Sequence, residues 1–143
     1  MFRLTRLNVC VILVLCASPA SSQDFCGTIA AVVAQAPSKF QSLRGPRDAF
    51  GDYGSHYMLP GATQCYVSGD DFDFVCKWRG VPEDSDTAKA KLARGIQQCY
   101  PQARAVTRNS SRGPSYSIRA NGILFRIHAN DRQTVFLGIG LDN

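Results

Sequence analysis

The chain has 143 residues, of which 45% are hydrophobic and 19% are charged, with a formal net charge of +5. These proportions are typical of a packed protein and exclude wholesale disorder, and the Gly and Pro content excludes collagen-like and low-complexity classes. The length fits one domain, because two domains would each be too small to build a good core.

The beginning of the sequence has the pattern of a cleaved secretory signal peptide. Arg3 and Arg6 precede an apolar run at residues 9–17, and small residues follow at 18–22. The apolar run has about half of the ~20 residues that a membrane span needs, so the sequence predicts no transmembrane segment.

We expect cleavage near Ser22, which leaves residues 23–143 as a single domain that is exported to the periplasm or the medium. The alternative is a lipoprotein with Cys16 lipidated after cleavage. That alternative needs a small residue before the cysteine, and Leu15 stands there.

Four cysteines remain after cleavage, and an even number in an exported chain indicates two disulfides. A four-thiolate zinc site is the weaker alternative, because zinc ligands usually come in close C-x₂-C pairs and the gaps here are long. Four cysteines allow three connectivities. The preferred pairing joins Cys65 to Cys76 across a hairpin and Cys26 to Cys99 between two helices.

Two segments have helical spacing of apolar residues. Asp24 can cap a helix that runs to about Ala36, after which Pro37 ends or kinks it. A second helix opens in the acidic residues 83–86, and its predicted inner face is Ala88, Leu92, Ile96 and Cys99.

The other patterned segments are predicted strands. A Gly-rich loop at 45–56 precedes a short strand at 57–59. Asn121-Gly122 is the strongest hairpin signal, because both turn residues must tolerate a positive φ. It places Ile118 opposite Phe125 and Tyr116 opposite Ile127. The remaining predicted strands are 63–68, 72–78, 103–107, 115–120, 123–128 and 134–139.

The predicted fold class is α+β. It is a two-layer sandwich with two helices packed on one face of an antiparallel sheet, in the order α-β-β-α-β-β-β(-β), and it carries two disulfides. Both helices have one apolar stripe and the strands alternate, so this arrangement buries every apolar face.

Charge is divided unevenly along the chain. Residues 23–86 carry nine acidic and five basic residues, whereas residues 87–143 carry two acidic and nine basic residues. Arginine pairs well with carboxylates and phosphates, so a basic surface would attract an acidic partner. The candidate binding residues are Arg108, Arg112, Arg119 and Arg126, with Arg119 and Arg126 on the outer face of the Asn121-Gly122 hairpin.

Catalytic candidates are few. His56 and His128 would form an acid–base pair only if they converge. The sequence predicts no metal site, because Asp70, Asp71 and Asp73 lack the remaining ligands of a calcium loop. It predicts no cofactor either, since no motif for one occurs.

The sequence therefore favours a small exported, non-catalytic binding module, in concrete terms an inhibitor or immunity-type protein of the cell envelope with an acidic protein partner. One alternative is a small secreted hydrolase of phosphodiesters or cell-wall polymers that uses His56 and His128. The other is a protein that binds a polyanion or an anionic lipid surface of the envelope. Nucleic acid is disfavoured, because the basic half has few aromatic residues to stack on bases.

Overall fold

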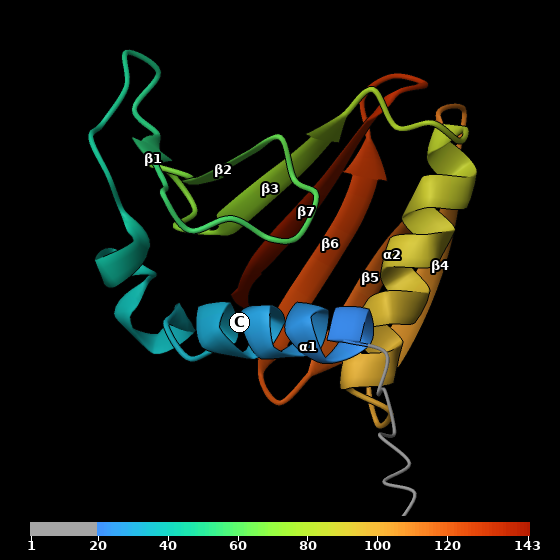
Figure 1. Ribbon diagram of the computed structural model, residues 1–143, viewed down its shortest axis with the longest axis horizontal. Helices are drawn as coiled ribbons and strands as arrows, with labels where there is room; N and C mark the ends of the chain where they lie inside the picture. Colours follow the sequence, from blue (N-terminus) through green and yellow to red (C-terminus); the bar gives the residue numbers. More distant parts are fainter. Residues whose placement is uncertain (1–19) are drawn as a thin grey trace, which may run out of the picture.

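The computed structural model describes residues 20–143 and shows two helices packed on one open, seven-strand antiparallel sheet (Figure 1). The predicted α+β fold class is confirmed. Most of the predicted signal peptide, residues 1–19, lies outside the described residues. Residues 20–22 form the start of the first helix.

The elements follow the predicted order, with one short edge strand and two 3₁₀ turns in addition. The sheet order is β1-β2-β3-β7-β6-β5-β4, so the last strand lies between the two groups of strands and joins them. The elements are α1 Ala20–Val33, η1 Ala36–Ser38, η2 Gln41–Leu43, β1 Tyr53–Gly54, β2 Gln64–Val67, β3 Phe74–Arg79, α2 Ser85–Cys99, β4 Arg104–Ser110, β5 Gly113–Ala120, β6 Ile123–Ala129 and β7 Thr134–Leu141.

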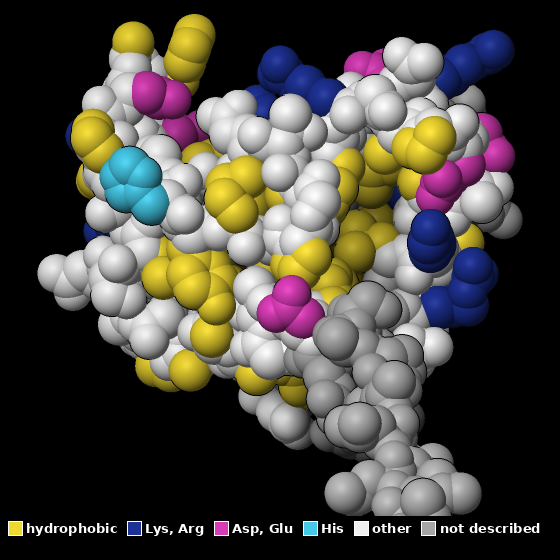
Figure 2. All heavy atoms as spheres, viewed as in Figure 1, with side chains coloured by type: hydrophobic (Ala, Val, Ile, Leu, Met, Phe, Trp, Pro, Cys, Tyr) yellow, Lys and Arg dark blue, Asp and Glu magenta, His cyan; other side chains and the backbone are white. Residues whose placement is uncertain are grey.

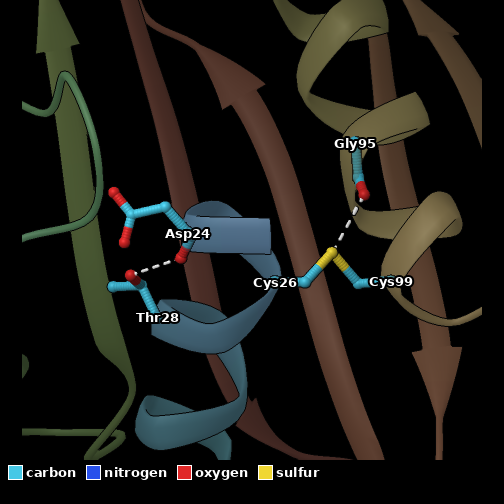
Figure 3. The surroundings of a disulfide bond; sticks show 5 residues. All are labelled: Asp24, Cys26, Thr28, Gly95 and Cys99. Atoms are coloured by element: carbon cyan, nitrogen blue, oxygen red, sulfur yellow. Dashed lines mark hydrogen bonds between the residues drawn. A yellow bond between two sulfur atoms is a disulfide. The ribbon is translucent and has the colours of Figure 1, made fainter. Parts of the chain in front are cut away.

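Helix α1 differs from the prediction at both ends. Asp24 is not its cap, because the helix already runs through this residue, and the Asp24 carbonyl accepts a hydrogen bond from the Thr28 hydroxyl at 2.7 Å (Figure 3). The helix ends at Val33 rather than Ala36. The chain continues as the 3₁₀ turn η1, which contains Pro37, a residue that cannot donate a helical hydrogen bond.

The strand predicted at 57–59 is also wrong. Those residues form a loop in which Leu59 is buried, and the short edge strand lies earlier, where Tyr53 pairs with Val67 of β2. Leu59 and, in part, Tyr57 thus pack on the core from a loop, whereas Met58 is exposed. The periodicity of three residues cannot distinguish this from a strand.

The predicted strand registers are confirmed. Cys65 lies opposite Cys76, Ile118 opposite Phe125, and Tyr116 opposite Ile127. In the turn between β5 and β6, Asn121 has φ 52° and Gly122 has φ 76°, as the sequence requires. The alternation of each strand therefore sends one set of side chains toward the helices and the other set away from them.

Both predicted disulfides are present. Cys26–Cys99 joins α1 to α2 (Figure 3), and Cys65–Cys76 joins β2 to β3. Because the four sulfur atoms are bonded in pairs, the zinc alternative is excluded. Two disulfides are consistent with an oxidising location outside the cytoplasm. Within residues 20–143, none of the helices combines the length and the apolar character needed to cross a membrane.

The predicted inner face of α2 is only partly correct. Ile96 is buried as expected, but Ala88 and Leu92 are half-buried, and the sequence analysis did not anticipate that Lys89 is 1% exposed. The Lys89 ammonium donates to the Pro114 carbonyl at 2.5 Å and lies 2.9 Å from an oxygen of Asp86. These two partners allow a charged group to be buried between α2 and β5.

Candidate functional site

The side of the sheet that faces away from the helices carries most of the predicted binding residues. The buried positions of each strand point toward the helices, so the residues between them form this second surface, which we call the outer face. It contains Lys77 and Arg79 of β3, Phe136 of β7, Arg126 and His128 of β6, Arg119 of β5, and Arg104, Val106 and Arg108 of β4.

The structure brings three of the four candidate arginines together. Arg108, Arg119 and Arg126 belong to neighbouring strands and share the outer face. Arg112 does not, because it lies in the turn between β4 and β5, where it lines a polar hollow beside the start of α2. The candidate surface is therefore the sheet face without Arg112.

Two of these arginines form ion pairs that the sequence did not reveal. Arg126 Nη1 lies 2.6 Å from Asp73 Oδ2, and Arg119 Nε lies 2.9 Å from Asp142 Oδ1. Burial raises the pKa of the Asp73 carboxyl, and Arg126 opposes that shift. Asp73 falls in the strand predicted at 72–78. Its partner Arg126 is 53 residues further along the sequence, a separation at which no local pattern signals the contact.

The outer face also has cations with no carboxylate beside them. Arg104, which the sequence analysis did not select, lies directly opposite Arg119 across β4 and β5. Opposed like charges destabilise a strand pair. In the described part of the chain, no acidic group lies within 4.0 Å of the cationic groups of Arg104, Arg108, Lys77 or Arg79. The surface thus has an excess of positive charge.

Strand β4 makes this charge accessible. It is an outermost strand of the sheet, and all seven of its residues are exposed. Val106 lies between Arg104 and Arg108 on the same side of the strand and is 44% exposed. On β6 and β7, the His128 ring stacks on Phe136 with the ring centroids 5.1 Å apart. The outer face therefore mixes arginine with apolar and aromatic groups, a composition that is typical of protein interfaces.

The structure does not bring the two histidines together. His56 follows β1 and His128 lies on β6, and strands β2, β3 and β7 stand between them. Four strand spacings correspond to about 19 Å, whereas a general acid and base must both be within hydrogen-bond reach of one substrate. Burial and the nearby Lys89 lower the pKa of His128. This geometry gives the hydrolase alternative no support.

Arg44 links the Gly-rich loop at 45–56 to the turn between β2 and β3, because it contacts the ring of Tyr53 in the loop and that of Phe72 in the turn. The Arg44 guanidinium lies 4.7 Å from the Phe72 ring centroid and 5.0 Å from that of Tyr53, and Lys39 lies 5.0 Å from Phe72. These contacts anchor the loop beside the sheet, and Phe50 near its tip remains 92% exposed. The loop brings neither histidine nor any of the predicted arginines into a catalytic arrangement.

No metal centre is evident in residues 20–143, because no three of their His, Cys, Asp or Glu side chains converge on one point. Comparisons with known protein families, with curated proteins and with solved structures find no match for this chain. The outer face, with its exposed arginines, is the candidate functional surface of the described residues.

Proposed function

We propose that the protein is a small exported, non-catalytic binding module whose outer face docks onto an acidic surface of a protein partner, as an inhibitor or immunity-type protein of the cell envelope would. The observation that carries this proposal is the exposed edge strand β4, where Arg104 and Arg108 flank Val106 on the outer face and have no carboxylate within 4.0 Å in the described residues. A carboxylate of a partner would add a charge-assisted hydrogen bond to each of these exposed guanidinium groups.

The scaffold is suited to such docking. The sheet has seven paired strands, and the two disulfides join β2 to β3 and α1 to α2. A surface that is already ordered loses little conformational entropy when it binds. The predicted signal peptide and the disulfides support export, which would place the partner in the envelope or outside the cell.

A protein partner is favoured over a lipid or nucleic-acid partner by the composition of the outer face. Val106 and Phe136 give it apolar area among the arginines, whereas binding to an anionic lipid surface needs little beyond charge. Few aromatic side chains are placed to stack on successive bases.

The test uses two doubly substituted proteins with the same change of charge. Arg104→Glu with Arg108→Glu reverses the charge of β4 on the outer face. It breaks no ion pair in the described residues, unlike substitution of Arg119 or Arg126. Arg112→Glu with Arg132→Glu is the control, because both residues line the polar hollow near α2 instead. Circular dichroism checks that each protein is folded.

The proteins are used to capture partners from envelope extract, and each captured protein is then purified and its affinity is measured. We expect the outer-face variant to lose binding and the control to keep it, and we expect the affinity to fall as the salt concentration rises. Equal affinity of both variants for the partner would contradict the proposal. So would binding only to vesicles that contain anionic lipid.

A further inference from the structure

A second candidate site lies on the opposite side of the sheet, where hydrophobic side chains line a hollow beside α2 (Figure 2). Its volume is about 430 Å³, within the range of pockets that bind small molecules. The walls come from α1, α2, the ends of β3 and β7, and the segment between β3 and α2. They include Phe25, Trp78, Val81, Pro82, Leu92 and Val135.

The hollow exists because the two helices do not cover the whole inner face of the sheet. Helix α1 lies across the strands while α2 runs beside them, and the two helices meet at one end, where Cys26–Cys99 joins them (Figure 1). Gly95 allows a close meeting, since a Cβ there would lie 3.3 Å from the Phe25 ring. The corner between the helices remains open above the ends of β3 and β7.

Trp78 forms a fixed wall of this pocket. Its indole N–H donates to the Pro60 carbonyl at 3.2 Å, and Gly61 packs against the same edge of the ring. The indole is therefore held in place with its polar atom satisfied, which leaves its apolar surface for a ligand. An apolar body would replace water over Trp78 and Leu92, and burial of that surface is favourable.

The rim of the pocket is polar on the side of α2. Lys91 is 74% exposed, and its ammonium lies 3.7 Å from Glu83, so this pair is too exposed and too long to hold the ammonium firmly. Arg94 follows Lys91 on the helix surface at the i,i+3 spacing of neighbours. Arg94 itself lies outside the lining, so Lys91 is the cation of this rim, and an anionic group can take the place of Glu83 as its partner.

We propose that this pocket binds one small amphiphile, a molecule with a flexible apolar body and a single anionic head group, with the body against Trp78 and the head at Lys91. The proposal is independent of the outer face, because the pocket is lined by the helices and the inner ends of strands. A fatty acid of medium chain length is the chemical class that fits both the apolar walls and the loosely paired ammonium of Lys91.

Trp78 is the only tryptophan of the chain, so its fluorescence reports on the pocket directly. The purified, disulfide-bonded protein is titrated with three probes that share one tail, namely decanoate, decanol and decyltrimethylammonium, each below its micelle concentration. We expect a saturable change in emission with decanoate and affinity lower by about tenfold for the cationic probe.

Two variants, each with a control, test the binding of the tail and of the head group separately. Ala88→Leu fills part of the pocket and is expected to lower the affinity for decanoate by about tenfold. Ala90→Leu is the matched control, because it lies on the same helix but is not among the lining residues. Lys91→Glu changes an exposed side chain, so the protein stays folded, and it should abolish the preference for decanoate. Arg47→Glu, at an exposed residue of the Gly-rich loop that does not line the pocket, makes the same change of charge and should preserve that preference.

Three results would overturn the proposal. The first is a fluorescence change that does not saturate, and the second is equal decanoate binding by the Ala88→Leu and Ala90→Leu proteins. The third is equal or tighter binding of decyltrimethylammonium by the unsubstituted protein. None of these results depends on the protein partner, so failure here is distinguishable from failure of the outer-face proposal.

Discussion

Removal of the Cys26–Cys99 disulfide should cost this protein much of its stability. The bridge closes a loop of 73 residues, and the loss of conformational entropy in the unfolded chain for a loop of that length corresponds to about 4 kcal/mol. A protein of this size has a total unfolding free energy of ~5–15 kcal/mol. Replacing both cysteines by alanine avoids leaving a reactive thiol.

Urea unfolding, followed by circular dichroism, measures the effect. We expect the double variant to unfold at a lower urea concentration and with a larger m-value, because its unfolded state is free to expand. The Cys65–Cys76 bridge closes only 11 residues, for which the same reasoning gives about 3 kcal/mol before any loss of core packing. If removal of Cys26–Cys99 costs less than about 2 kcal/mol, loop closure is not its main contribution.

Three further predictions test the packing of the sheet. Lys89→Met leaves the Pro114 carbonyl without its donor and should lower the free energy of unfolding by about 1–3 kcal/mol; unchanged urea stability would contradict this. Gly122→Ala places a Cβ on a residue with φ 76° and should lower the free energy of unfolding by about 1–2 kcal/mol. Gly27→Ala, in an open position of α1, should raise it by about 0.5–1 kcal/mol. Changes of the same sign in both variants would contradict these two backbone conformations. Because the pKa of His128 is lowered from 6.5 in the folded protein, the unfolded chain binds more protons, so stability should rise with pH just below 6.5. Proton NMR and thermal unfolding check this, and His128→Phe should remove that slope.

Local rules explain the parts of the fold that the sequence determined by itself. The Asn121-Gly122 turn sets the register of β5 and β6, because only a few residue types tolerate its backbone angles. Alternation then places Arg119 and Arg126 on the outer face. Alternation also indicated the hairpin around Cys65 and Cys76, but the sequence left the disulfide connectivity open, and the structure decides it.

Only the tertiary structure decided how these pieces meet. The position of β7 between β3 and β6 depends on which strand edges are free, and no short segment encodes it. That placement separates His56 from His128 and lets Asp73 reach Arg126. The burial of Lys89 and the pocket at Trp78 likewise arise where a helix meets the sheet at one particular angle. Periodicity and turn residues act over a few positions, whereas these contacts join residues that are distant in sequence.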